Sequence, residues 1–241
     1  ISPMSFKGII WASLFIFLYK SMKNGLIFYC QVDLITYRRK FFLLIIVITH
    51  RDSMYIPKVF EETDKKRIIR LVEEYGFGTL VTCHEGVPFA SHLPMMIEDS
   101  EEFVMSGHMA RENNQWKNFE ENIDVLAIFQ GPHAYISPSN YESPIAPTWN
   151  YTSVHLYGKC RIVEDETKLR EMIESLTDKY EKHQTSPWVP DYPDRLLKVI
   201  VGFELVVSRV EAKYKLSQNR PETDRKTIIS KFSSTGNDGE K

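Results

Sequence analysis

Cysteine is scarce in this chain of 241 residues, which has only three, at Cys30, Cys83 and Cys160. They lie far apart, and no two stand in a C-x-x-C spacing. An odd and sparse set of cysteines is typical of free thiols in a reducing compartment and not of a disulfide framework. Nothing in the sequence marks any of them as a nucleophile. We therefore expect free thiols and a cytoplasmic protein.

A hydrophobic run long enough to span a membrane is also missing. The two longest runs, residues 9–19 and 41–48, fall short of the roughly 20 apolar residues that a spanning helix needs. The first run, with Lys7 before it, resembles the apolar part of a secretory signal, but no small-residue cleavage pattern follows it. Two interpretations of residues 1–53 remain open. One is translated sequence upstream of a true start at Met54, which we favour, and the other is a membrane anchor.

The net charge is only −2 at pH 7, but it is unevenly distributed. Residues 1–53 hold seven basic and two acidic residues, a net +5, whereas residues 54–241 hold 23 basic and 30 acidic residues, a net −7. With 43% hydrophobic and 26% charged residues, the composition is that of a globular protein and excludes disorder or a collagen-like repeat. We expect an N-terminal extension over 1–53, one domain over 54–221 that buries its own core, and a polar tail over 222–241.

The common catalytic signatures are absent. The sequence has no G-x-S-x-G, no H-E-x-x-H, no Walker A loop and no G-x-G-x-x-G. Its seven histidines show no ligand-type pairing, so we expect no metal site. Gly76-Phe77-Gly78 is too short for a dinucleotide loop and is better interpreted as a helix exit into a strand. No residue is therefore assigned a catalytic role.

The apolar pattern of residues 54–221 predicts many strands at hairpin spacing with a few helices between them. Thr63 is positioned to cap a helix that ends near Tyr75, and Leu169 to Tyr180 carry the strongest helical stripe in the chain. A short helix is expected over 113–122, and strands over 77–83, 87–97, 102–107, 125–130, 134–137, 151–163 and 203–216. This order predicts a mainly β protein with α decoration (α+β), an antiparallel sheet or barrel.

Two polar clusters interrupt the first strands. Ser91 to Pro94 lies inside an otherwise apolar strand, and a proline there predicts a bulge or an edge, with or without a ligand. Ser106 to Trp116 crosses from a strand into a helix, where backbone N–H groups, Arg111 and His108 together suit a phosphate. An ordinary connection capped by Asn113 is the alternative. We favour the ligand, because Gly107 also lets a backbone approach closely.

Two further clusters lie later in the chain. Gln130 to Tyr135 and Pro147 to Tyr151 set aromatic rings beside amides, which would wall a flat heteroaromatic ring, although core packing or a dimer contact explains them equally well. Lys215 to Pro221 closes the last strand with polar residues, and Arg220 would reach an anion from a dimer partner unless it is simply solvated. Together the four clusters indicate a bound phosphorylated aromatic ligand and no nucleophile at work.

Several long motifs resemble one family. They are MYIPKVFEE from Met54, GHMARENNQW from Gly107, FQGPHAYISP from Phe129, PTWNY from Pro147 and KLSQNR from Lys215. They are similar to the PaiB family, the FMN-binding negative transcriptional regulators also called protease synthase and sporulation negative regulators. The resemblance begins at Met54 and ends near Pro221, whereas residues 1–53 have no counterpart in it. One departure is Ser139-Asn140-Tyr141, where the family often has an aromatic residue in the middle.

This resemblance implies an FMN-binding split β-barrel, similar to pyridoxamine-phosphate-oxidase-like proteins and usually a homodimer with flavin at the interface. It implies that the β-segment at 92–95 lies along the isoalloxazine, that 108–115 holds the phosphate and ribityl chain, and that later residues close the pocket from the second subunit. The cofactor-binding residues expected from it are His92, Leu93, Pro94, Met95, His108, Met109, Ala110, Arg111, Asn114, Gln115, Trp149, Gln218 and Arg220.

The function that the resemblance implies is a cytoplasmic, dimeric repressor of sporulation and protease genes. DNA is then a partner, directly or through another protein, and no membrane is expected for 54–241. The charge of −7 argues against a DNA-binding surface, which is usually basic, and the best basic stretch, 209–231, has a net charge of only +4. The alternative is an FMN-dependent oxidoreductase or a haem-handling barrel, and a third is a ligand sensor without catalysis.

Overall fold

The structure is a computed structural model of the whole chain. It describes the backbone of three strands within residues 13–47, and then residues 53–98, 102–119, 124–141 and 146–235. The chain divides into two compact units, Ile1–Ser53 and Met54–Lys241. In the first unit β1 (Ser13–Leu18), β2 (Leu26–Asp33) and β3 (Phe41–Val47) form an antiparallel sheet in the order β1-β2-β3.

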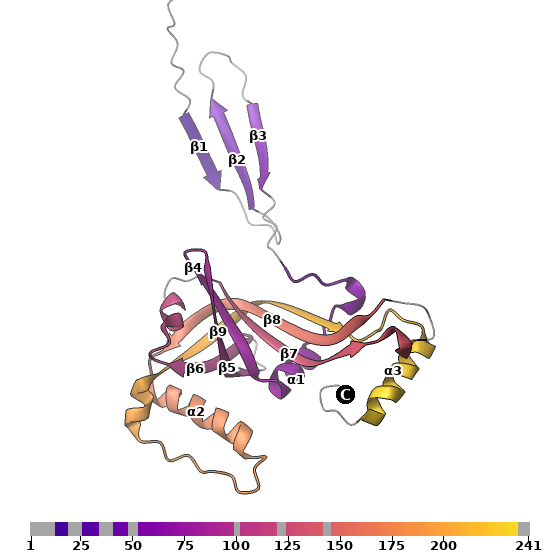
Figure 1. The fold of residues 1–241 in the computed structure, drawn as a ribbon. Helices are drawn as coiled ribbons and strands as arrows, with labels where there is room; N and C mark the ends of the chain where they lie inside the picture. The colour runs from indigo at the N-terminus through magenta and orange to yellow at the C-terminus, as the bar shows by residue number, and fades with distance from the viewer. Residues whose placement is uncertain are drawn as a thin grey trace, which may run out of the picture. The chain divides into compact units, whose positions relative to one another are not determined.

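The second unit is built on a closed barrel of antiparallel strands in the order β4-β5-β6-β9-β8-β7 (Figure 1). The bounds are β4 (Phe77–His84), β5 (Val87–Glu98), β6 (Val104–Ala110), β7 (Val125–Ile136), β8 (Thr148–Val163) and β9 (Ile200–Lys215). The antiparallel barrel expected from the sequence is confirmed. β8 and β9 are the longest strands and run side by side along most of their length.

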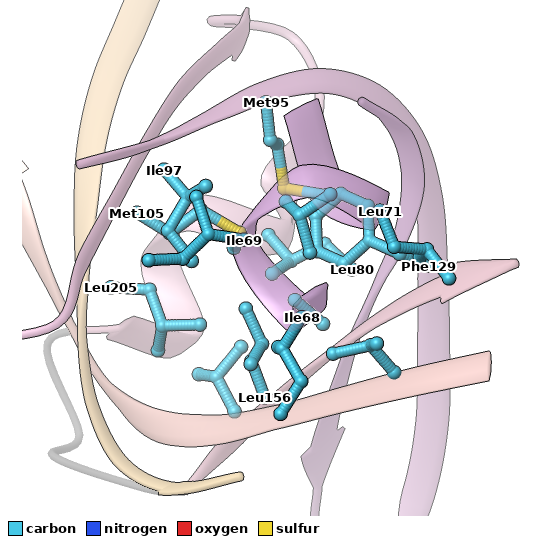
Figure 2. Close-up of a cluster of buried hydrophobic side chains, with 14 of the residues drawn as sticks. Ile68, Ile69, Leu71, Leu80, Met95, Ile97, Met105, Phe129, Leu156 and Leu205 are labelled. Atoms are coloured by element: carbon cyan, nitrogen blue, oxygen red, sulfur yellow. The ribbon is translucent and has the colours of Figure 1, made fainter. Parts of the chain in front are cut away.

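Side chains alternate between the barrel interior and its outer face, as the period of a strand requires. The interior is filled by apolar residues from all six strands and from one face of α1 (Lys65–Glu74), which gather into a single cluster (Figure 2). Leu80, Met95, Met105, Phe129 and Leu205 in this cluster are fully buried. The barrel is therefore a packed core, and any ligand that binds it must do so on its outer face or at its ends.

Three α-helices decorate the barrel in the part of the chain that the structure describes. α1 begins after Asp64, whose carboxylate accepts a hydrogen bond from the Lys66 N–H, so the expected cap at Thr63 is wrong by one residue. α2 (Glu166–Glu181) lies beside β5, β6 and β8, and of the stripe expected from Leu169 to Tyr180 it buries Leu169 and Leu176, while Tyr180 is exposed. α3 (Glu222–Thr235) was not expected from the sequence, and it buries Ile228 against Ile136.

Short helices fill the connections: η1 (Lys58–Phe60), η2 (Asn114–Phe119), η3 (Pro138–Asn140) and η4 (Asp194–Val199). The helix expected over 113–122 is thus a six-residue 3-10 helix, and residues 120–123 lie outside the described chain. The strand expected over 102–107 is displaced and runs through Ala110. The two strands expected over 125–137 are one, β7, because a bulge between Gln130 and His133 joins them.

Cys83 and Cys160 are free thiols, as expected, and Cys30 lies outside the described side chains. Among the residues that the structure describes, no helix combines the length and the apolar character that crossing a membrane would need. The expected C-terminal tail begins with α3, and residues 236–241 lie outside the described chain.

Candidate functional site

The first expected site segment, His92 to Met95, belongs to β5. His92 points outward and is exposed, Leu93 and Pro94 are half-buried, and the Met95 side chain is fully buried in the core. His92 and Pro94 therefore present side chains outside the packed interior, whereas Leu93 packs partly against the core. The Met95 side chain contributes to the barrel core, where Figure 2 shows it.

Pro94 marks no bulge, but among the described residues it pairs with a strand on one side only, which agrees with the edge expected from the sequence. β5 pairs with β4 up to Pro94 and with β6 from Met95 onward. Pro94 therefore stands where the hydrogen-bond ladder passes from one neighbour to the other, and the N–H that proline lacks is not needed there. The next residue, Met95, donates its N–H to the Gly76 carbonyl oxygen at 2.8 Å, so this backbone group is paired where β5 changes its neighbouring strand.

β6 leads from the core to the second expected segment. His108 points outward and is half-buried, and burial holds its pKa below the ordinary histidine value. Met109 is in the core, and Ala110 is exposed at the end of the strand. Gly107 faces inward, where a Cβ would lie 2.8 Å from the Phe203 ring, so its small size serves core packing and not the approach of a ligand.

Arg111 fastens the end of β6 to the start of β9. Its backbone N–H donates to the Val199 carbonyl, its Nε to the Lys198 carbonyl and its Nη2 to the Ile200 carbonyl, each at 2.9 Å. A side chain expected to bind phosphate thus has two of its donor nitrogens occupied by backbone. The Trp116 indole in turn donates to the Arg111 carbonyl at 3.0 Å.

Amide side chains tie the loop after β6 to β4 and β5. Asn113 accepts the Gln115 N–H through Oδ1 at 3.1 Å, as the expected cap, and its Nδ2 donates to Ser91 Oγ at 2.8 Å. Gln115 is 1% exposed, and its Nε2 donates to the carbonyls of Leu80 at 2.9 Å and Phe89 at 3.3 Å. A buried amide that bridges two strands holds this loop in one geometry.

The same loop leaves some hydrogen-bonding groups without a protein partner. Gln115 Oε1 is buried and has no partner among the described residues. The N–H groups of residues 111, 113 and 115 are used within the protein, whereas no described residue accepts from those of Glu112 and Asn114. With the exposed Asn114 side chain and His108 nearby in sequence, these donors suit a phosphate oxygen. A group with phosphate and hydroxyls therefore fits the residues present.

We use the name β5–β6 wall for the expected residues on β5, on β6 and in the turn and 3-10 helix that follow, without the core residues Met95 and Met109: His92, Leu93, Pro94, His108, Ala110, Arg111, Asn114 and Gln115. Ser91, Asn113, Thr82 and Asn118 support it: Asn118 Nδ2 donates to Thr82 Oγ1 at 3.1 Å. Sequence reasoning assigned the first two to polar clusters but missed the last two, because contacts between residues 36 positions apart leave no local pattern.

The remaining expected residues, Trp149, Gln218 and Arg220, form what we call the β8–β9 end. Trp149 is 53% exposed, and its ring lies 5.9 Å from that of Tyr135 and 6.2 Å from that of His133. Gln218 Oε1 accepts the N–H of Leu216 at 2.6 Å. The Arg220 guanidinium lies 5.4 Å from the Tyr141 ring. This end is therefore an exposed aromatic and cationic surface.

One protomer does not bring the β5–β6 wall and the β8–β9 end together. His92 pairs with Thr79, which pairs with Ile128, which pairs with His155 on β8. Trp149 thus lies three strands from His92 and six residues further along β8, about 14 Å across the sheet and about 20 Å along it. The expected residues form two surfaces and not one pocket.

The chain was compared with known proteins. The family model "Putative FMN-binding domain" matches residues 54–209. "Protease synthase and sporulation protein PAI 2" of Bacillus subtilis is 45% identical over 190 residues, which cover 76% of this chain and 91% of that protein. An uncharacterized protein of Emericella nidulans is 30% identical over 235 residues, covering 78% of this chain and 94% of its own.

Solved structures share the fold. The FAD and heme binding protein of Mycobacterium smegmatis superposes with a TM-score of 0.54 at 14% identity, covering 70% of this chain and 79% of that one. The flavocytochrome Anf3 of Azotobacter vinelandii gives 0.51 at 14% identity, covering 64% and 69%. The barrel thus has the split-barrel fold of these flavoproteins. The match to the FMN-binding family model identifies its cofactor as FMN. On the family match and the relationship to PAI 2, the chain belongs to the PaiB family of FMN-binding proteins.

Proposed function

We propose that this protein is a homodimeric, FMN-binding negative regulator of transcription that acts on sporulation and protease genes. The observation that carries the proposal is the β5–β6 wall, an internally braced surface that keeps N–H and amide groups available for a phosphorylated ligand within the residues that match the FMN-binding family. The Bacillus subtilis relative is named for protease synthesis and sporulation, which supports the regulatory part. We take residues 54–221 as the functional domain.

In this proposal the β5–β6 wall holds the flavin by position and not by covalent chemistry. His92, Leu93 and Pro94 lie along the isoalloxazine, and Met95 supports them from the core. Asn114, the neighbouring N–H groups and His108 receive the phosphate and ribityl chain, with Met109 and Ala110 setting the end of β6. Because burial lowers the pKa of His108, its imidazole is neutral near pH 7 and binds as a hydrogen-bonding group. Bound FMN would supply reversible uptake of electrons.

The dimer follows from the separation of the two surfaces. Trp149, Gln218 and Arg220 lie too far from His92 to close over the same flavin within one protomer, so a second copy would supply them. The outer face of β4 and β7 offers half-buried apolar side chains, Val81 and Leu126 as direct neighbours and Ile128 two pairs further along. An isologous contact through such a face would let the β8–β9 end of each copy reach the flavin on the β5–β6 wall of the other copy.

DNA is the target of the proposed regulation, reached directly or through a partner protein. The acidic charge of residues 54–241 disfavours a broad DNA-binding face. Basic residues concentrate between Arg209 and Lys231, which includes part of β9 and α3. Gel shifts with the purified dimer test direct binding. A sequence-specific shift of the DNA supports direct binding. A shift that does not depend on the sequence and disappears as the salt concentration rises argues for a partner protein.

An absorption spectrum of the freshly purified full chain tests for the cofactor. Sedimentation analysis of the same sample tests for the dimer. The proposal expects flavin bands close to one FMN per chain and the mass of a dimer. A strong Soret band in their place would contradict FMN as the resident group. A monomer that binds FMN tightly would contradict a site shared between two copies, but it would still support FMN as the cofactor.

A further inference from the structure

A cavity lies between α1 and the strands β7, β8 and β9, away from the β5–β6 wall. Its volume is about 640 Å³, within the range of small-molecule sites. The described residues that line it are Arg67, Arg70, Leu71, Glu74, Tyr75, Pro132, Thr152 and Tyr214. None of them belongs to the residues expected to bind FMN, so the cavity has no role in the proposed flavin site.

A bulge in β7 forms one side of this cavity. The register between β7 and β8 shifts between Gln130 and His133, within the polar cluster from Gln130 to Tyr135. Gly131 lies over Thr152, and a methyl group on it would collide with Thr152 Oγ1. The bulge thus brings glycine backbone close over a hydroxyl group, and a larger residue would fill the space.

The Thr152 hydroxyl is the unusual group here. Thr152 is 6% exposed, and its Oγ1 has no hydrogen-bond partner among the described residues. A buried polar atom without a partner costs free energy, so such atoms usually mark a bound water, ion or ligand. Since Thr152 lines the cavity, its buried hydroxyl lies at the wall of the space that a ligand would enter.

Two arginines one turn apart on α1 face the same cavity. Arg67 forms an ion pair with Glu62 at 2.9 Å, and its guanidinium lies 5.3 Å from the Tyr214 ring. Tyr214 also donates its hydroxyl to the Arg67 carbonyl at 3.0 Å, which anchors this turn of the helix. Arg70 makes no hydrogen bond or ion pair with any described residue. A guanidinium without a partner is suited to a carboxylate or a phosphate.

The charges around the cavity favour an anion. Among the described lining residues Glu74 is the single acid, against Arg67 and Arg70. Burial first, and the Glu74 carboxylate second, raise the pKa of Tyr75, and burial raises the pKa of Tyr214 to about 12. Both phenols are therefore neutral at physiological pH and add no negative charge.

We propose that this cavity binds a small oxyanion-bearing molecule, a carboxylate or a phosphate ester, between the Arg70 guanidinium and the Thr152 hydroxyl. Arg70 supplies the charge and a planar pair of donors, and Thr152 supplies a buried hydrogen bond that water-exposed lysines would not give. α1 also packs its apolar face into the barrel core. A molecule bound in the cavity would therefore contact a helix that is itself part of the core packing.

Isothermal titration of the full chain, with and without saturating FMN, tests this site with two probes at constant ionic strength: inorganic phosphate and succinate. We expect at least one to bind, and to bind equally with FMN present. Arg70→Gln and Thr152→Val should each weaken that binding roughly tenfold. Lys66→Gln, an exposed cation on α1 outside the cavity lining, is the matched control and should leave it unchanged.

The Thr152→Val variant carries its own check on folding. Removing an unpartnered buried hydroxyl for a group of the same shape should leave the unliganded protein at least as stable in urea. Weaker binding in a variant of equal or higher stability supports the site. Phosphate binding alone identifies a phosphate ester as the class, and succinate binding alone a carboxylate. No binding of either probe, or binding that Arg70→Gln and Thr152→Val leave unchanged, overturns the proposal.

Discussion

The β5–β6 wall and the β8–β9 end are both surfaces expected to touch one flavin, yet they are built differently. The wall is braced from below, because Gln115 is buried and Arg111 is bonded to three backbone carbonyls. At the β8–β9 end, Trp149 is mostly held by ring contacts and is half exposed. A braced surface suits binding in a single protomer, whereas an exposed aromatic surface gains its contacts only when something covers it.

The largest effect is expected from breaking the brace of the wall. Gln115→Leu removes the hydrogen bonds to the Leu80 and Phe89 carbonyls, so it should lower the free energy of unfolding by roughly 2 kcal/mol. Urea denaturation followed by circular dichroism measures this. Asn114→Ala, an exposed neighbour, is the control and should stay within about 0.5 kcal/mol. Equal stability of the two variants would mean that the buried amide does not brace the wall.

The opposite pattern is expected at the β8–β9 end. Trp149→Ala should weaken FMN binding about tenfold, because the ring covers the flavin, and should change the unfolding free energy of the flavin-free chain by about 0.5 kcal/mol or less. Flavin fluorescence titration and urea denaturation give the two values. The control is Trp188→Ala, which removes a similarly exposed tryptophan outside the expected site. If both variants bind FMN as the unaltered chain does, Trp149 is no part of the site.

Conservative changes of two arginines sharpen the comparison. Arg111→Lys loses the fork that holds the Lys198 and Ile200 carbonyls, and about 1 kcal/mol of stability should go with it. Arg220→Lys keeps a cation near Tyr141 and should change stability by less than about 0.5 kcal/mol. Thermal unfolding of the flavin-free proteins compares them. A larger loss for Arg220→Lys would reverse the assignment of the braced surface.

The smallest effect concerns pH. Since the pKa of His108 is lowered by burial in the folded chain, the unfolded chain takes up its proton first as the pH falls. Stability should therefore decline below about pH 6.5, the ordinary histidine value, and His108→Asn should make that decline shallower. His155 also has a lowered pKa, so part of the slope remains. Urea unfolding between pH 7 and pH 5 gives the change of the unfolding free energy with pH. If this change is the same in His108→Asn as in the unaltered chain, partial burial does not keep His108 neutral.

The sequence predicted those elements whose signals are local. The hairpin of β4 and β5 follows from the two expected strands, 77–83 and 87–97, which only three residues separate, and α2 follows from its stripe beginning at Leu169. Gly107 was misinterpreted because its partner, Phe203, lies on a strand far along the chain. α3 was missed since its apolar residues are few, and Ile228 is buried only because Ile136 and Tyr141 lie against it.

For the residues expected to bind FMN, the sequence indicates segments better than the direction of each side chain. Motif resemblance locates His92 to Met95 and His108 to Gln115, but a strand sends alternate side chains to opposite faces, so Met95 and Met109 are in the core. Arg111 looked like a phosphate ligand because nothing near it in sequence reveals the carbonyls 87 and 89 residues away that it binds. Register across the barrel decides these roles.

In the proposed dimer, one flavin contacts the β5–β6 wall of one copy and the β8–β9 end of the other. Two variants test it by mixing: Asn114→Glu, which sets a carboxylate against the phosphate, and Trp149→Ala. Each alone should bind FMN poorly, whereas dimers re-formed from an equal mixture should restore tight binding at about a quarter of the sites, because each mixed dimer has one site with both surfaces intact. Fluorescence titration of the mixture counts those sites. No tight sites in a mixture shown to exchange subunits would contradict a shared flavin site.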